Sequence, residues 1–272
     1  KREVDAGHQV AVVVSAMSGV TNQLVKWCQD LSALHDAREY DTVVATGEQV
    51  TTGLTAIALQ AIGVDARSWQ GWQVPIVTDQ AHGKARVESI DGAALIERME
   101  QGQVPVVAGF QGIDPKRNRI TTLGRGGSDL SAVAIAAAVK ADRCDIYTDV
   151  DGVYTTDPRI VPRARKLKRI SYEEMLELAS VGAKVLQTRS VELAMKQRVR
   201  VQVLSSFEDK PGSLVVDEDE IVEQPVVSGI AYSRDDAKIT LRRVPDRPGV
   251  AAAVFGALAK ANVNVDMIVQ NI

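Results

Sequence analysis

The stretch TTLGRGGSDLSAVAIAAAVKA, residues 121–141, joins a polar, glycine-rich turn to a long alanine-rich run. The alanine-rich part predicts a helix over 129–140, and the apolar run VPVVAGF at 104–110 predicts a buried strand before the turn. In open α/β sheets, ligands bind beyond the ends of the strands, where loops lead into helices. The glycine-rich turn occupies such a place and is therefore the first candidate for a binding site.

The polar residues of this turn are suited to hold an anion and an amino group. Its glycines let the backbone approach an anion closely, and the following helix start offers free amide groups. Arg125 can hold a carboxylate or a phosphate through paired hydrogen bonds. Ser128 and Asp129 can orient an ammonium group or a lysine, although either is also an ordinary helix cap. Because these residues share one turn with the glycines, the pattern favours a binding site over a plain turn.

Apolar runs alternate with helix-period segments over about the first 205 residues. Strands are predicted at 10–14, 104–110, 144–149 and 199–206. Helices are predicted at 21–34, 36–46, 48–62, 91–102, 129–140, 172–186 and 190–197. Ser171 and Glu174 have the spacing of a capping box at the start of one of these helices. The alternation predicts an α/β domain with a mostly parallel sheet covered by helices on both faces.

The pattern changes after residue 206. Residues 207–225 carry a Pro-Gly turn, an acidic cluster and another proline, and are predicted to link a domain at 1–206 to a smaller one at 226–272. The smaller part reads strand (227–233), strand (237–243), helix (248–261) and strand (263–269), and this order stops before such a fold is complete. The chain also begins among charged residues without a methionine, so we expect truncation at both ends.

Composition excludes several classes of protein. The formal net charge is −3 and aromatic residues make up 4%, which favours neither electrostatic nor stacking contacts with nucleic acid. No apolar run approaches the roughly 18–20 residues that span a membrane, and no signal peptide is recognisable. Cys28 and Cys144 lie far apart and have no metal-type spacing. We therefore expect a cytoplasmic protein with reduced cysteines and without a nucleic-acid or membrane partner.

Other polar segments also follow predicted strands. YTDVDGVYTTDPR at 147–159 combines hydroxyls, carboxylates and an arginine, as a nucleotide site requires, although acidic loops of this kind are common on surfaces. SAMSGVTN at 15–22 and ATGEQVTTG at 45–53 are weaker signals, since Glu48 is also an ordinary partner of a helix dipole. GAKVL at 182–186 places Lys184 near the predicted end of a helix, where lysine usually faces solvent.

Taken together and in this order, SAMSGVTN, TGEQVT, VAGFQG, TTLGRGGSD, YTDVDGVYTTDPR and GAKVLQTRSVELA resemble the aspartokinases of the amino-acid kinase family. The tail LRRVPDRPGVAAAVFGALAKANVNVDMIVQN resembles the first ACT module of the lysine- or threonine-regulated members. The resemblance covers nearly the whole chain. It implies a three-layer α/β/α amino-acid kinase fold as the catalytic domain, followed by a partial ACT-type βαβ regulatory domain.

The resemblance also implies an activity. It is the transfer of the ATP γ-phosphate to the side-chain carboxylate of L-aspartate, giving 4-phospho-L-aspartate on the way to lysine, threonine and methionine. An aspartate carboxylate has a pKa near 3.9 and is a nucleophile at neutral pH without a general base, so His8, His35 and His82 are interpreted as incidental. Mg²⁺ is expected with ATP, held by phosphate and water oxygens and not directly by protein side chains.

The resemblance assigns residues to four roles. Catalytic roles fall to Asp129, which would hold a lysine in place, and Lys184. The aspartate pocket would contain Thr21, Glu48, Arg125, Gly126, Gly127 and Ser128. The ATP site would contain Ser15, Thr148, Asp149, Tyr154, Asp157, Arg159, Lys184 and Val185. The allosteric site for lysine, threonine or both would contain Asp246, Gly249, Val250, Asn264, Val265, Asp266, Gln270 and Asn271. ACT pairing implies a homo-oligomer or a separate regulatory subunit.

One departure from the family pattern bears on activity. The family opens with a strand that ends in a Lys-Phe-Gly-Gly-Thr-Ser-type motif, and this sequence has no match to it. We therefore expect an aspartokinase fragment of low activity that lacks the first strand. Two alternatives stay open: another amino-acid kinase, for example one acting on glutamate, and a non-catalytic amino-acid sensor. The segment at 147–159 and the ACT-like tail argue against the first alternative.

Overall fold

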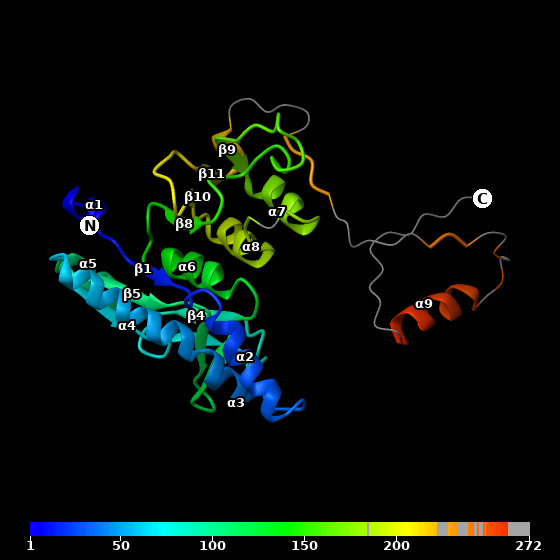
Figure 1. Ribbon diagram of the computed structural model, residues 1–272, viewed down its shortest axis with the longest axis horizontal. Coiled ribbons are helices and arrows are strands. Elements are labelled where there is room, and N and C mark those ends of the chain that lie inside the picture. The colour runs from blue at the N-terminus through cyan, green and yellow to red at the C-terminus, as the bar shows by residue number, and fades with distance from the viewer. Residues whose placement is uncertain are drawn as a thin grey trace. The chain divides into compact units, whose positions relative to one another are not determined.

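The protein is described by a computed structural model over residues 1–183, 185–221, 228–232, 239–241, 244, 247 and 249–260 (Figure 1). The chain forms two compact units, Lys1–Tyr232 and Ser233–Ile272. The first unit is a mixed α/β structure. Within the second unit the structure describes one helix, α9 (Val250–Lys260), which agrees with the helix predicted at 248–261.

The first unit alternates helices and strands along the chain. Its helices are α1 (Arg2–Asp5), α2 (Val20–Leu31), α3 (Ala37–Val44), α4 (Thr46–Ala61), α5 (Ala93–Glu100), α6 (Gly127–Ala138), α7 (Tyr172–Ser180), α8 (Thr188–Gln197) and the 3₁₀ helix η1 (Glu218–Glu220). Its strands are β1 (Val12–Val14), β2 (Ala66–Trp69), β3 (Ile76–Thr78), β4 (Val87–Ile90), β5 (Val104–Ala108), β6 (Gln111–Asp114), β7 (Arg119–Thr122), β8 (Cys144–Thr148), β9 (Arg169–Ser171), β10 (Val201–Ser205) and β11 (Ser213–Val216). Each strand and helix predicted for residues 1–206 is found.

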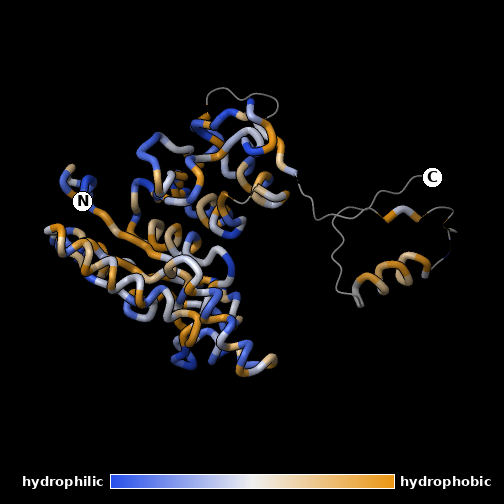
Figure 2. The backbone as a smooth tube through the Cα atoms, in the orientation of Figure 1, coloured by the Kyte–Doolittle hydropathy of each residue, from blue (hydrophilic) through white to orange (hydrophobic). Residues whose placement is uncertain are grey.

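The first sheet is parallel, with the order β1-β5-β2. Val12 pairs with Val106 and Ala66 pairs with Val104, so β5 lies in the middle. The hydrophobic run into β1 follows a polar N-terminal turn (Figure 2). Because side chains alternate along a strand, Val106 packs towards α4 and Val107 packs towards α5 and α6. The sheet is therefore covered by helices on both faces, as predicted.

Helix α6 belongs to more than one hydrophobic core. Ile135 packs with the β1-β5-β2 sheet, Val133 packs with the second sheet, and Leu130 packs beneath the glycine-rich turn. A helix that is apolar on all sides is suited to full burial, and small alanine side chains let neighbouring elements approach. This position explains the alanine-rich composition of the run that follows the turn.

The second sheet has the order β8-β10-β11-β9. β8 and β10 are parallel, β10 and β11 are antiparallel, and β11 and β9 are parallel. Helices α7 and α8 pack on its core through Met175 and Ala194. The predicted capping box is present at the start of α7, where Ser171 Oγ accepts from the Glu174 amide and the Glu174 carboxylate accepts from the Ser171 amide.

A third sheet, β4-β3-β6-β7, was not predicted from the sequence. Its strands are three or four residues long and mix polar with apolar residues, as in QGID and RITT, so no hydrophobic period reveals them. Two hairpins, β3–β4 and β6–β7, build it. It matters for function because β7 ends at Thr122, directly before the glycines of the turn.

Two predicted boundaries differ from the structure. Helix α7 ends at Ser180 and not near 186, because the left-handed Gly182 (φ 120°) breaks it and packs closely against the Tyr232 carbonyl. Residues 213–216, inside the predicted linker 207–225, form β11 and complete the second sheet. The domain boundaries themselves stay a prediction. The strand predicted at 227–233 is not found, since residues 228–232 are described and do not lie in a strand. The strands predicted at 237–243 and 263–269 fall largely or wholly outside the described residues.

Candidate functional site

The candidate site begins where the ends of β1 and β5 meet the start of α6. The Gly109 amide, just beyond β5, donates to the Val14 carbonyl at the end of β1 (3.0 Å). A Cβ built on Gly109 would lie 3.0 Å from both the Ser128 side chain and the Val14 carbonyl oxygen. A glycine is therefore needed here for the glycine-rich turn to approach the loop that follows β1.

Glu48 lies in the first turn of α4 and faces the same loop. Its side chain is buried, Oε1 accepts from the Ala16 amide (3.0 Å), and Oε2 is buried without a hydrogen-bond partner among the described residues. Burial raises the pKa of this carboxyl group above its ordinary value. A buried acceptor without a partner lowers the stability of the fold. Such a cost is expected where the group binds a ligand.

The backbone of the glycine-rich turn is held from several sides. The Leu123 amide donates to the Phe110 carbonyl (2.9 Å), and the Gly127 amide donates to the Gly124 carbonyl (3.0 Å). Gly124 and Gly126 have positive φ angles of 79° and 70°, which favour glycine. The turn thus has one defined conformation, set by bonds to its backbone, and it leaves its longer side chains available.

Arg125 is the exposed residue of the turn and makes no hydrogen bond or ion pair within the described part of the chain. Ser128 and Asp129 are half-buried in the first turn of α6. Desolvation raises the pKa of Asp129 to about 6, and this carboxyl group likewise has no bonded partner among the described residues. The turn therefore presents an unpaired guanidinium, a hydroxyl and a partly desolvated carboxyl group.

Two further predicted residues follow β1 closely in the chain. Ser15, from the predicted ATP site, is exposed directly after the strand, and Thr21, from the predicted aspartate pocket, is half-buried in the first turn of α2. A Cβ on Gly47 would come within 2.8 Å of the Ala16 side chain, so the start of α4 packs tightly on this loop. Thr21, Glu48 and the glycine-rich turn are thus carried by segments that meet around the end of β1.

The segment 147–159 lies at the end of β8, and its charged groups pair with one another. Arg159 Nη2 lies 2.8 Å from Asp157 Oδ2, and this pairing lowers the pKa of Asp157. Tyr154 donates its hydroxyl to Asp151 Oδ1 (3.0 Å). Asp149 is exposed and accepts one bond, from the neighbouring Thr148 hydroxyl (3.2 Å). The segment is polar and accessible, but its side chains are engaged in local pairs.

Several predicted residues fall outside the description. Lys184 is one, while its neighbour Val185 is half-buried in the turn before α8 and not in a helix. Of the predicted effector residues, Gly249 (φ 96°) and Val250 stand at the start of α9. Asp246, Asn264, Val265, Asp266, Gln270 and Asn271 lie outside the described residues.

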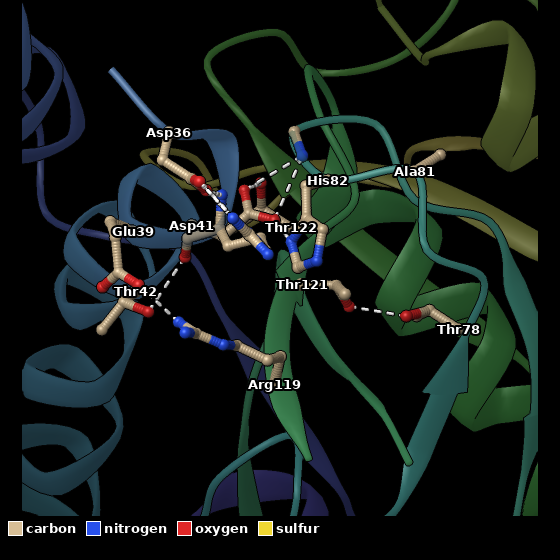
Figure 3. Close-up of polar contacts among 12 residues, drawn as sticks. Asp36, Glu39, Asp41, Thr42, Thr78, Ala81, His82, Arg119, Thr121 and Thr122 are labelled. Atoms are coloured by element: carbon tan, nitrogen blue, oxygen red, sulfur yellow. Dashed lines mark hydrogen bonds and ion pairs between the residues drawn. The ribbon is translucent and has the colours of Figure 1, made fainter. Parts of the chain in front are cut away.

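The structure also reveals a polar cluster that the sequence did not indicate (Figure 3). Asp41, on α3, is fully buried and accepts hydrogen bonds from His82, from the Gly83 amide and from Thr122. His82 thus has a buried hydrogen-bond partner, whereas His8 is exposed and His35 is half-buried. Partners separated by 41 and 81 positions in the sequence leave no local signal.

Comparisons with known proteins agree on the type of fold. The model of the amino acid kinase family matches residues 1–205, and that of the ACT domain matches residues 239–272. An aspartate kinase from Stutzerimonas stutzeri is 56% identical over 273 residues, which is 100% of this chain and 66% of the relative. The chain thus spans slightly less than two thirds of that relative's length.

Two solved structures of E. coli aspartokinase III have the same fold. The one in complex with aspartate and ADP (R-state) has a TM-score of 0.72 and 28% identity, covering 99% of this chain and 72% of that chain. The one in complex with lysine and aspartate (T-state) has a TM-score of 0.74 and 26% identity, with the same coverage.

None of the helices in the described part of this chain has the length and hydropathy that crossing a membrane requires.

Proposed function

The chain belongs to the amino acid kinase family, and from that premise we propose that it is the catalytic part of an aspartate kinase. The proposed reaction transfers the γ-phosphoryl group of ATP to the side-chain carboxylate of L-aspartate. One observation carries the proposal: the Arg125 guanidinium and Glu48 Oε2, neither of which has a partner among the described residues, lie on segments that meet at the end of β1. An amino acid substrate presents an α-carboxylate and an α-ammonium group, which are their complements.

The substrate pocket follows from this pairing. Arg125 holds the α-carboxylate of aspartate, and Glu48 Oε2 accepts from the ammonium group, supported by the hydroxyls of Thr21 and Ser128. Gly126 and Gly127 keep the backbone close to the bound carboxylate. The side-chain carboxylate of the substrate is then left to face the nucleotide.

The nucleotide is proposed to lie at the end of β8. Ser15, Thr148, Asp149, Tyr154, Asp157, Arg159, Lys184 and Val185 are the residues proposed to contact it. Mg²⁺ is proposed to accompany the ATP phosphates, held by phosphate and water oxygens and not directly by protein side chains. The E. coli structure in complex with aspartate and ADP supports a site for each of these two ligands.

The chemistry of the step needs no proton acceptor. A substrate carboxylate oxygen attacks the γ-phosphorus, the bond from that phosphorus to the β–γ bridging oxygen breaks, and ADP leaves with the electron pair. Since the attacking carboxylate is already ionised at neutral pH, the protein contributes alignment and positive charge. Asp129 is proposed to hold a catalytic lysine in place, and Lys184 is proposed as a second catalytic residue.

Regulation by amino acids is proposed for the ACT region. The described part of that region contributes Gly249 and Val250 at the start of α9, and the amide groups of a helix start are able to receive an effector carboxylate. The T-state E. coli structure contains lysine, which supports lysine as an effector, and threonine is the alternative or second effector. Effector binding is proposed to act within an assembly formed through ACT modules, either of identical chains or with a separate regulatory subunit.

Turnover with ATP and candidate amino acids tests the proposed reaction. Acyl phosphates react with hydroxylamine, so aspartyl hydroxamate should form with L-aspartate and much less with L-glutamate. The assay uses the 272-residue chain and a chimera that adds the residues of the Stutzerimonas relative outside the aligned region. Hydroxamate formation in either protein supports the proposal. Formation with glutamate alone, or with neither substrate in both proteins, contradicts it.

A further inference from the structure

The buried cluster around Asp41 lies directly behind the glycine-rich turn. Asp41 has no exposed surface, and its carboxylate accepts from Thr122 Oγ1 (2.5 Å), from His82 Nδ1 (2.7 Å) and from the Gly83 amide (3.0 Å). A carboxylate can only accept, so Nδ1 is the ring nitrogen that carries the proton. Figure 3 shows the side chains of Asp41, His82 and Thr122 converging from three different segments.

The donors to Asp41 are the groups that hold the turn in place. Thr122 is the last residue of β7, and its carbonyl accepts from the Ala85 amide (2.9 Å). The Gly83 carbonyl oxygen would lie 3.0 Å from a Cβ on Gly124, so the loop that joins β3 to β4 packs closely on the turn. Asp41 therefore ties α3 to this hairpin loop and to the residue that enters the turn.

Arg189, on α8, also holds the backbone at the start of the turn. The Arg189 guanidinium donates to the Leu123 carbonyl (2.5 Å) and to the Ala85 carbonyl (2.8 Å). Beneath these bonds, Ala85, Leu123 and Leu130 form a small buried hydrophobic cluster. The backbone from 121 to 124 is thus bonded or packed at each residue, and Arg125 is the next residue along the chain.

We propose that Asp41 and His82 are positioning residues, which fix the glycine-rich turn so that Arg125 is held ready for a substrate carboxylate. The proposal rests on the proposed function for the identity of that ligand. The His82 side chain is only 6% exposed, and its Nε2 atom is buried without a hydrogen-bond partner among the described residues. An unpartnered buried nitrogen costs stability, so packing alone would favour an apolar ring at this position. The ring is needed for its bond to Asp41.

Two substitutions of His82 separate positioning from packing. His82→Leu removes the Nδ1–H donor and leaves the buried carboxylate with fewer partners. His82→Asn keeps an amide donor close to the place of Nδ1. His8→Leu, at an exposed histidine, is the matched control, and Thr122→Val removes a second donor to Asp41 if His82→Leu does not fold.

Hydrogen exchange and titration calorimetry on the full chain give the decisive readouts. In His82→Leu we expect backbone amides at 121–127 to exchange about tenfold faster in the absence of ligand. Aspartate affinity should fall by about tenfold, whereas ADP affinity should change by less than about twofold. His82→Asn should recover most of both losses, and His8→Leu should match the wild type.

The outcomes distinguish this inference from the proposed function. Unchanged exchange at 121–127 in His82→Leu and in Thr122→Val would overturn the positioning role. An equal loss of aspartate and ADP affinity would also overturn it, since it would indicate general destabilisation. A wild-type chain that binds ADP but not aspartate would overturn the proposed substrate, and the exchange result alone would then decide the positioning role.

Discussion

Residues 121–129 and residues 147–159 both follow a strand and both carry charged side chains, but they are held in different ways. In the first segment the backbone is fixed by neighbours on three other elements, while Arg125 makes no pair among the described residues. In the second segment Asp157 pairs with Arg159, and Asp151 pairs with Tyr154 and Lys166. The proposed aspartate end of the site, residues 121–129, is thus formed before the ligand binds. At the proposed nucleotide end, residues 147–159, ion pairs within the protein must be exchanged for contacts with the ligand.

The contrast has an energetic consequence. A ligand that meets a fixed, unpaired cation loses little free energy to ordering the protein. A ligand that must displace existing ion pairs gains only the difference between the new and the old interactions. Single substitutions should therefore have larger effects at the aspartate end than at the nucleotide end.

The largest effect is expected for Arg125→Ala. Arg125 is the cation of the turn and has no partner among the described residues. Its loss should therefore lower kcat/KM for aspartate by a factor equivalent to about 2–4 kcal/mol, mainly through KM. Steady-state kinetics on a turnover-competent chain with varied aspartate measure this effect, and the ATP KM serves as the internal control. An unchanged aspartate KM would contradict the expectation that substitutions have larger effects at the aspartate end than at the nucleotide end.

A smaller effect is expected for Asp129→Asn, which should stabilise the folded protein. The folded-state pKa of about 6 lies above the ordinary value of 3.8, so the fold favours the protonated carboxyl group. As pH rises from about 4 to about 6, the unfolded chain loses this proton first, and folding loses stability. Asparagine avoids that loss, so the variant should be more stable by about 1–3 kcal/mol at pH 7.5 and nearly equal at pH 4.

Thermal unfolding of both proteins at several pH values checks this expectation. The Tm difference should grow with pH over that interval. A constant difference, or a variant that is less stable at pH 7.5, would show that the Asp129 carboxylate is not desolvated. Turnover of the variant should fall at the same time, because Asp129 is proposed to orient a lysine.

At the nucleotide end, Asp149→Ala should weaken ADP binding by about 1 kcal/mol and leave aspartate binding unchanged. Tyr154→Ala should have a similar effect, since the ring and its bond to Asp151 shape the same segment. Titration calorimetry with each ligand measures both affinities. Wild-type ADP affinity in both variants would show that the nucleotide binds at another part of the molecule.

The smallest effect is expected for the stability change on Arg159→Gln. The Arg159 side chain is 88% exposed, so solvent screens its pair with Asp157 and the substitution should leave the free energy of unfolding almost unchanged. Chemical denaturation of the two proteins measures the difference. A clear loss of stability would show that the nucleotide segment is fixed as firmly as the glycine-rich turn.

Part of this architecture could be predicted from the sequence. Helix α6, the glycine-rich turn and the capping box of α7 depend on local residue order, and each was predicted correctly. The β3–β4 hairpin and the Asp41–His82 bond depend on partners far apart in the chain and on short strands of mixed polarity. His82 resembles a loop histidine until the fold places it against a buried carboxylate.

A structure of the chain with L-aspartate bound tests the central claim most directly. We expect the α-carboxylate of the ligand at about 2.7–2.9 Å from the Arg125 guanidinium nitrogens, and the ammonium group against Glu48 Oε2. The backbone of residues 121–127 should move by less than about 1 Å from its ligand-free position, because the turn is already fixed. Aspartate bound away from Arg125, or a turn that rebuilds its backbone around the ligand, would contradict the account.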